Sequence, residues 1–301
     1  MCGIIGYIGK QDAVPIIVEG LKKLEYRGYD SAGLAVCDEN GFSVVKQKGR
    51  LEALENKLKG MTLSAHVGIG HTRWATHGEP SDVNSHPHIG GQNRIAVVHN
   101  GIIENYKEIK EHLERNGVQF HSQTDSEVIA QLAEYYYDGD IIRTVIKLSH
   151  RLEGSYALGI MCADNPDILV AIKKDNPLII GTSPHGNFIA SDVPAVLKYT
   201  NQVCYLCDNE IAILQSGGVK FFNTMRERLN KQFETVAWNL ESAEKGGYPH
   251  FMLKEIMEQP KVMKDTVSNL LYGQGAAFIK DLGITDYSRI VITACGSAYN
   301  A

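Results

Sequence analysis

The order of apolar segments along this chain restricts the folds that it can adopt. From about residue 154 to residue 222, strand-like segments follow one another without a helical segment between them: GSYALGIMCA, DILVAIKK, PLIIGT, NFIAS, VCYLC, EIAIL and VKFF. Helical patterns come earlier, at about 12–28, 51–60, 105–115, 125–137 and 140–151. Parallel strands need long, usually helical crossovers, and that alternation is missing. The order therefore predicts antiparallel sheets packed on each other and flanked by helices, a layered α+β domain.

Further strands are expected in the first hundred residues. The segments GIIGYIG, HVGIGHTR and NRIAVVHNG are short and apolar, which is typical of buried strands. AGLAV and FSVVKQKG flank the turn signal DENG, so we expect these two strands to form a hairpin.

Composition excludes several classes of function. The chain has 301 residues and a net charge of −5, so it lacks the basic surface of a nucleic-acid-binding protein. It shows no secretory signal pattern and no apolar run long enough to span a membrane, and we expect a cytoplasmic protein. The cysteines are too sparse for a disulfide framework, and we expect them to remain reduced: Cys2, Cys37, Cys162, Cys204, Cys207 and Cys295.

The length predicts about two domains, and the sequence changes character after residue 222. We expect a first domain at 2–222, a charged, aperiodic linker at 223–247 and the start of a second, α/β domain at 248–301. The segment SRIVITACGSAYNA has the pattern of a buried first strand and its turn, so this second domain would be truncated. Alternatively, that strand joins the sheet of the first domain, since neighbouring elements often pair.

Four polar stretches interrupt the apolar pattern: YRGYDSAG from Tyr26, HTRWATHGEP from His71, HNGIIEN from His99 and SQTDSE from Ser122. Each has a structural explanation as well as a functional one. The first can end a helix at Gly28, and the third can form a hairpin turn. The fourth can start a helix that is capped by Thr124 or Asp125. Taken singly, these motifs do not establish a site.

Histidines are frequent between residues 66 and 99, but no HExxH and no paired CxxC accompanies them, so their spacing does not match a zinc motif. The single CYLC segment lies in strand-like sequence, which does not favour a redox-active pair. We therefore expect neither a metal nor another cofactor.

The second residue, Cys2, offers a nucleophile and a base together. Its small side chain permits removal of Met1, which would leave one residue with both a thiol and a free α-amine. In model compounds the α-amine has a pKa of about 7.7–8.0 and the thiol one of about 8.5, so the amine is able to take the thiol proton at neutral pH. The alternative is a small residue that only packs in a buried strand.

Together with Cys2, the polar stretches resemble a known family in their order along the chain. MCGIIGYIG, LEYRGYDSAG, GHTRWATHGEP, HPH, VVHNGIIEN and SQTDSE are similar to the N-terminal glutaminase domain of the glutamine:fructose-6-phosphate amidotransferases, and ITACGSAYNA to the start of their sugar isomerase half. The resemblance implies an N-terminal-nucleophile hydrolase, a four-layer αββα sandwich of two antiparallel sheets, followed by a truncated α/β isomerase domain. It also implies that Cys2 attacks the side-chain amide of L-glutamine and forms a glutamyl thioester, with release of ammonia.

The resemblance assigns roles to further residues. Asn100 and Gly101 match the side-chain and backbone donors of the oxyanion hole, which stabilise the tetrahedral intermediate. Arg73 matches the residue that binds the α-carboxylate of glutamine, a bidentate task suited to a guanidinium. Asp125 matches the carboxylate that pairs with the α-ammonium group.

Four other matches would surround bound glutamine. Thr76 and His77 match the loop that folds over the substrate. Trp74 matches the residue that gates the exit of ammonia, and Arg27 an arginine that lines the site near the nucleophile.

In the full-length family enzyme, a homodimer is expected, and the ammonia converts fructose 6-phosphate to glucosamine 6-phosphate. Here the sugar half is nearly absent, and CGSA at 295–298 departs from the usual CGTS because Ala298 lacks a hydroxyl. We therefore expect only the glutaminase half-reaction from this chain. Two alternatives remain open: the glutaminase domain of another amidotransferase of the same class (the purine, asparagine or glutamate synthase branches), and a non-catalytic, glutamine-binding regulatory module.

Overall fold

The computed structural model describes residues 2–236, 247–272, 283 and 287–294. The chain divides into two units, Met1–Leu240 and Glu241–Ala301. The first unit contains an eight-stranded and a seven-stranded sheet, and the strand ladders described in both are antiparallel.

The eight-stranded sheet has β1 near its middle, between β10 and β4. In spatial order it contains β15 (Glu234–Thr235), β11 (Gln202–Tyr205), β9 (Ile179–Ser183), β10 (Gly186–Ala190), β1 (Gly3–Gly9), β4 (Val67–Arg73), β2 (Ser31–Asp38) and β3 (Gly41–Lys48). Its outer face carries α1 (Ala13–Leu24), α2 (Leu51–Leu58) and the 3₁₀ turn η2 (Val193–Ala195), and the 3₁₀ turn η1 (Glu25–Arg27) directly follows α1.

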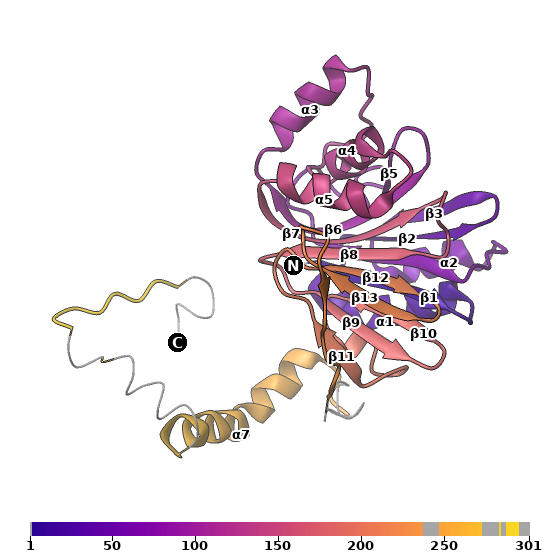
Figure 1. Cartoon of the computed structure of the whole chain (residues 1–301). Helices are drawn as coiled ribbons and strands as arrows, with labels where there is room; N and C mark the ends of the chain where they lie inside the picture. Colours follow the sequence, from indigo (N-terminus) through magenta and orange to yellow (C-terminus); the bar gives the residue numbers. More distant parts are fainter. Residues whose placement is uncertain (1, 237–246, 273–282, 284–286, 295–301) are drawn as a thin grey trace. The chain divides into compact units, whose positions relative to one another are not determined.

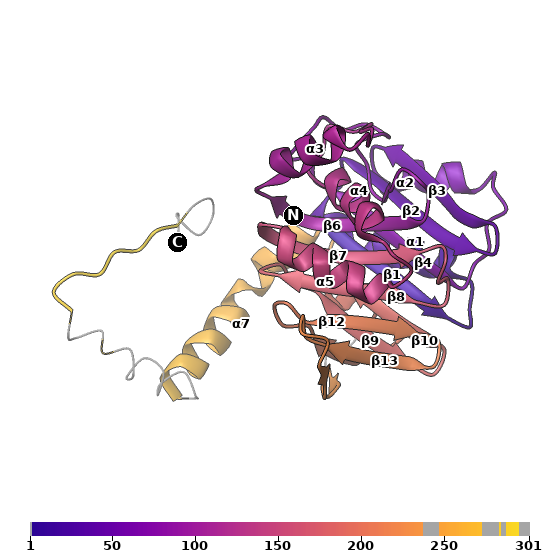
Figure 2. The ribbon, with the colours of Figure 1, turned by 45° about the horizontal axis from the view of Figure 1, so that its top comes forward.

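The seven-stranded sheet has β7 and β6 at one side of its middle strand, β8. In spatial order it contains β14 (Arg228–Leu229), β13 (Gly218–Phe222), β12 (Ile211–Gln215), β8 (Leu169–Lys174), β7 (Gly154–Cys162), β6 (Ile95–Ile103) and β5 (His88–Ile89). Its outer face is covered by α3 (Tyr106–Arg115), α4 (Glu127–Tyr136) and α5 (Ile141–Arg151), which lie together on one side of the sheets (Figures 1 and 2).

Alternating side chains along β1 show how the layers form. Ile5 and Tyr7 pack into the core beneath α1 and α2, whereas Ile4 and Ile8 pack into the core between the two sheets. A third core joins the seven-stranded sheet to α3, α4 and α5. The first unit is therefore a sandwich of helix, sheet, sheet and helix layers, and the sequence prediction of a layered α+β fold is confirmed.

Most predicted elements are present, with differences at short strands. The two-residue strands β5, β14 and β15 were not predicted, because so short a segment carries no periodicity of its own. The hairpin turn considered for His99–Gly101 is wrong, because these residues lie within β6. The segment 223–247, predicted as a linker, contributes β14 and β15, and the amide of Val236 donates to the carbonyl of Asn201 at 2.8 Å.

The described part of the second unit contains the helix α7 (Phe251–Tyr272), with Pro260 inside it. The strand predicted within SRIVITACGSAYNA is not formed in residues 287–294, where Ile292 is 88% exposed. A strand needs partners for its backbone groups, and no described strand pairs with this segment. The rest of that prediction, residues 295–301, lies outside the described residues. In the described part of the chain, no helix is both long and apolar enough to cross a bilayer.

Candidate active site

Cys2 directly precedes β1, and three donors from other segments converge on it. Arg27 Nε and Asn100 Nδ2 each donate to the Cys2 carbonyl oxygen at 3.0 Å. The backbone amide of Trp74 donates to Cys2 Sγ at 3.2 Å. These contacts fix both the main chain and the sulfur of Cys2 relative to η1, β4 and β6.

The Cys2 thiol is a poor nucleophile without a base. Burial raises the pKa of the Cys2 thiol, while the Trp74 hydrogen bond and the charges of Arg73 and Arg27 act in the opposite direction. Because burial dominates, the thiol is protonated at neutral pH. A nearby group that accepts its proton is therefore required for nucleophilic attack.

Asn100 and Gly101 lie side by side in β6, and both are constrained. The Asn100 amide contacts His71 Nε2 through Oδ1 at 2.9 Å and Ser191 Oγ through Nδ2 at 2.9 Å. Gly101 has φ +128°, and a Cβ there would lie 2.0 Å from the Ser155 carbonyl oxygen on β7. This strand position therefore accepts only glycine.

Arg73 ends β4 and holds the following loop in place. Its guanidinium donates to the carbonyl oxygens of Gly78 at 3.0 Å and Glu79 at 3.4 Å, and also to that of His77. Burial lowers the pKa of Arg73, and the charges of Cys2, Asp125 and Asp30 oppose that shift. Arg73 thus lies within electrostatic reach of both Cys2 and Asp125.

Asp125 is buried but does not cap the helix that follows it. Its Oδ2 accepts from the amide of Ile103, at the end of β6, at 2.9 Å. The residue before α4, Ser126, makes no side-chain cap hydrogen bond, but Thr124 Oγ1 accepts from the amide of Glu127, the first residue of the helix, at 3.3 Å. Of the two residues considered as caps from the sequence, Thr124 is therefore the one that contacts the start of the helix, and Asp125 is bonded to the strand that carries Asn100.

The remaining predicted residues occupy the loop after β4 and the turn after α1. Trp74 is exposed and meets Tyr29 edge to face at 5.3 Å, and Thr76 on the same loop is also exposed. His77 packs edge to face on Tyr106 at 5.8 Å. Arg27, besides contacting Cys2, lies 3.4 Å from a carboxylate oxygen of Asp192.

The structure thus brings Arg27, Trp74 and Asn100 into direct contact with Cys2. Arg73 interacts electrostatically with Cys2, and its guanidinium donates to backbone carbonyls of the loop that contains Thr76 and His77. Asp125 accepts a hydrogen bond from Ile103 of β6, the strand that also carries Asn100. Sequence reasoning assigned no role to Ser191 or Asp192, or to His71 beyond its place in a motif. Ser191 and Asp192 are a polar pair directly after the apolar strand β10, and this pattern is the sequence feature that indicates a possible role for them.

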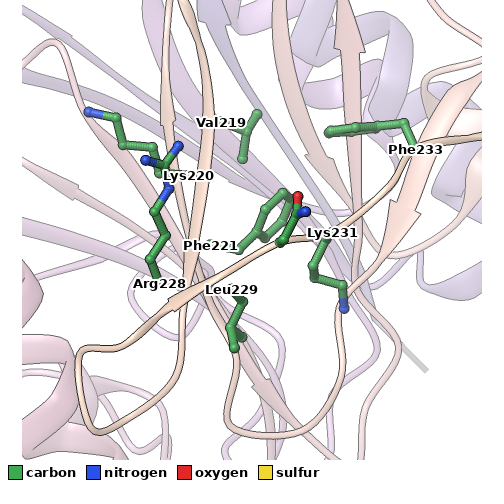
Figure 3. A pocket seen from close by; sticks show the side chains of 8 residues that line it. Val219, Lys220, Phe221, Arg228, Leu229, Lys231 and Phe233 are labelled. Carbon is green, nitrogen blue, oxygen red and sulfur yellow. The ribbon is translucent and has the colours of Figure 1, made fainter.

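No predicted site residue lines the hollow between β13, β14 and the segment that leads to β15 (Figure 3). Its volume is about 320 Å³, and its lining is basic and aromatic: Val219, Lys220, Phe221, Arg228, Leu229, Asn230, Lys231 and Phe233. Among the described residues, no group of three or more histidine, cysteine or acidic side chains has the geometry to hold a metal ion.

Comparison with known proteins gives consistent matches. A family model described as a glutamine amidotransferase domain matches residues 71–198. The isomerizing glutamine–fructose-6-phosphate aminotransferases of Clostridium acetobutylicum and Aquifex aeolicus are 51% and 46% identical to this chain. Each alignment covers 100% of this chain and 50% of the relative, so the chain spans about half the length of the curated relatives it matches.

Solved structures share the fold. Glutamine phosphoribosylpyrophosphate amidotransferase from B. subtilis, complexed with ADP and GMP, has a TM-score of 0.64 at 26% identity, over 75% of this chain and 50% of that one. A glutamine aminotransferase class-II domain protein from Silicibacter pomeroyi has a TM-score of 0.50 at 12% identity, over 74% of this chain and 99% of that one. The second likeness concerns the fold alone.

Proposed function

Because this chain belongs to the family of isomerizing glutamine–fructose-6-phosphate aminotransferases and contains their glutamine amidotransferase domain, we propose that its first unit hydrolyses L-glutamine to glutamate and ammonia. The observation that carries the proposal is the convergence on Cys2. Arg27 and Asn100 each donate to its carbonyl oxygen at 3.0 Å, and the Trp74 amide donates to its sulfur at 3.2 Å. The first two contacts fix the main chain of Cys2 and the third fixes its sulfur, so the thiol is held in a defined position.

In the proposed reaction, the mature chain begins at Cys2. The thiol pKa is raised by burial, so the α-amine of the same residue takes the thiol proton as Sγ attacks the side-chain carbonyl carbon of glutamine. The C–N bond then breaks, the amine passes the proton to the leaving nitrogen, and ammonia departs. Water hydrolyses the remaining glutamyl thioester to glutamate and restores the thiol.

Asn100 and Gly101 would form the oxyanion hole. The Asn100 Nδ2 group already faces the main chain of the nucleophile, and Gly101 follows it in a conformation that side chains rarely adopt. The two Nδ2 hydrogens bond Cys2 O and Ser191 Oγ in the structure, so one of them would be shared with the oxyanion during the reaction. Loss of one oxyanion donor typically lowers kcat about 100- to 1000-fold.

Arg73 and Asp125 would recognise the amino-acid head of glutamine. They are buried, opposite in charge and electrostatically coupled, which suits a zwitterion with one carboxylate and one ammonium group. Thr76 and His77 would cover the substrate, and Arg73 would link their loop to the bound carboxylate, since its guanidinium donates to the carbonyl oxygens of His77 and Gly78. Trp74 would gate the ammonia exit, and Arg27 would hold Cys2 in position.

In the longer protein, we propose that the ammonia reacts with fructose 6-phosphate to give glucosamine 6-phosphate. The support is the identity of 51% to a relative of that activity, which also favours this acceptor over those of other amidotransferases. A homodimer is proposed for the longer protein. We also propose a cytoplasmic location, which suits the free thiols described at Cys2, Cys37, Cys162, Cys204 and Cys207.

The test measures glutamate and amino sugar separately after incubation with glutamine and fructose 6-phosphate. The 301-residue chain should form glutamate and no glucosamine 6-phosphate, and Cys2→Ala should form neither. Cys207→Ala is the matched control, because Cys207 is an exposed cysteine in the same unit, and it should hydrolyse glutamine at the wild-type rate. Glutamate formation by Cys2→Ala at the wild-type rate would refute the proposed mechanism.

A further inference from the structure

The side-chain amide of Asn100 is held on three sides. Its Oδ1 lies 2.9 Å from His71 Nε2, and its Nδ2 lies 2.9 Å from Ser191 Oγ and 3.0 Å from the Cys2 carbonyl oxygen. His71 is 1% exposed and Ser191 2%. Neither residue has a role in the reaction proposed above.

The partners of His71 determine where its proton lies. Nε2 is 3.0 Å from the carbonyl oxygen of His99, which can only accept a hydrogen bond, so Nε2 must carry hydrogen. Burial lowers the pKa of His71 to about 3, so the ring is neutral at pH 7 and Nδ1 carries no hydrogen. The Nε2–H group is therefore shared between the His99 carbonyl and Asn100 Oδ1.

This donor selects one of the two orientations of the amide. The two orientations exchange the oxygen and the NH₂ group and differ little in shape. With Oδ1 accepting from His71, the NH₂ group faces Cys2 O and Ser191 Oγ. The reverse orientation would place Oδ1 against the Cys2 carbonyl oxygen and would present a partial negative charge to the oxyanion. In the first orientation Ser191 Oγ accepts from Asn100 Nδ2, and it also accepts from the amide of Ile4, two residues after Cys2, at 2.8 Å.

The surroundings keep the His71 ring in place. His71 lies on β4 and stacks on His86 with ring centroids 4.1 Å apart, and His86 Nδ1 in turn accepts from the amide of His99 at 3.3 Å. Burial also lowers the pKa of His86, so two uncharged rings stack without repulsion. The stack fixes the plane of the donor that faces Asn100.

We propose that His71, with Ser191, is a positioning residue that holds the Asn100 NH₂ group toward the reacting centre at Cys2. This inference rests on the proposed glutaminase function. His71 acts through Asn100 and does not touch glutamine, so its loss should slow the chemical step and leave binding unchanged.

The first test compares two amide substitutions in the 301-residue chain. In His71→Gln, the amide nitrogen extends about as far as Nε2 and still reaches Asn100, whereas in His71→Asn it is one methylene short. His71→Asn should lower kcat for glutamine hydrolysis about 10- to 100-fold with KM within about twofold, because small misplacements of a catalytic group cost this much. His71→Gln should recover most of the activity.

His88→Asn is the matched control. His88 is as buried as its neighbours and contacts Thr124 Oγ1 at 3.1 Å, and it has no described contact with Asn100. Its kcat should remain within about threefold of wild type. Thermal unfolding of every variant identifies those that fold. A rise in KM with unchanged kcat for His71→Asn, or equal losses for His71→Gln and His71→Asn, would overturn the inference.

The second test is a double-mutant cycle with Asn100→Ala. If His71 acts through Asn100, His71→Asn should cost less than about twofold in kcat when Asn100 is already alanine. If His71→Asn lowered kcat by the same factor in the wild-type and Asn100→Ala backgrounds, the inference would be overturned. The proposed function would still stand in that case, because the wild-type chain would still hydrolyse glutamine. If His71→Asn does not fold, Ser191→Ala takes its place in the cycle with the same two outcomes. A wild-type chain without glutaminase activity would instead overturn the proposed function, and this inference with it.

Discussion

Gly101→Ala tests how tightly the backbone of β6 is constrained beside Asn100. A Cβ at residue 101 would lie 2.0 Å from the Ser155 carbonyl oxygen, far inside any real contact, with φ at +128°. The strained backbone costs about 1–3 kcal/mol. Separating β6 from β7 at the Gly101–Tyr156 pair would weaken about two hydrogen bonds, at about 1 kcal/mol each. We therefore expect a loss of about 3–5 kcal/mol in the free energy of unfolding.

Gly117→Ala is the matched control for this prediction. Gly117 also has a positive φ, +84°, but a Cβ there meets nothing within 4 Å. It should cost only the backbone strain, about 1–2 kcal/mol. Urea unfolding measures both variants, and thermal midpoints should fall by about 2–4 °C per kcal/mol for a unit of this size. Equal free energies of unfolding for Gly101→Ala and Gly117→Ala would refute the reasoning about the close approach to Ser155.

The remaining predictions concern kinetics and pH. Asn100→Ala should lower kcat about 100- to 1000-fold with little change in KM. Arg73→Lys and Asp125→Asn should chiefly raise the KM for glutamine. An Asn100→Ala variant with unchanged kcat and raised KM would contradict the oxyanion assignment. Burial lowers the pKa of His71 to about 3, so this ring takes up a proton only when the chain unfolds. Its contribution to stability is therefore complete above about pH 6.5 and falls by about 1.4 kcal/mol per pH unit as the pH drops from about 6.5 toward 3. Urea unfolding at several pH values should show a shallower slope for His71→Gln, and identical slopes would contradict a neutral, buried His71.

Local patterns in the sequence predicted the elements that carry strong periodicity. In α1, helical spacing places Val14, Ile17, Leu21 and Leu24 on one face; the last three are fully buried, whereas Val14 is only partly buried. The hairpin of β2 and β3 was expected at DENG, and Asp38 does pair with Gly41 there. These features depend on residues close together in the chain, so the sequence alone was sufficient to predict them.

Features that depend on distant residues could not be predicted in this way. The position of β1 between β4 and β10 joins segments that are far apart in the chain, and no local pattern encodes the choice of partner. In the same way, the segment SQTDSE has the local pattern of a helix start, in which Asp125 could be a cap. Only the contact of Asp125 with the amide of Ile103, a distant residue, shows that Asp125 is bonded to β6 instead. The hydrogen bonds that hold the Asn100 side chain include one to Ser191, which is 91 residues away in the sequence.

The resemblance to a family supplied the candidate site that local patterns left undecided. Composition and spacing gave each polar stretch a structural explanation, and only their shared order suggested glutamine chemistry. The structure then added residues for which the resemblance gave no role, His71 and Ser191, because their part in the site is a hydrogen bond to another side chain.

Covalent labelling of Cys2 by a glutamine analogue with an electrophilic side chain tests the account most directly. Peptide mass spectrometry would locate the adduct in two forms of the chain, one beginning at Cys2 and one that retains Met1. We predict a single adduct on Cys2 in the first form, suppressed by excess glutamine, and none on Cys2 in the second. Cys207 is exposed and serves as an internal control for unspecific reaction. Labelling of Cys207 in place of Cys2, or equal labelling of Cys2 with Met1 retained, would contradict the account.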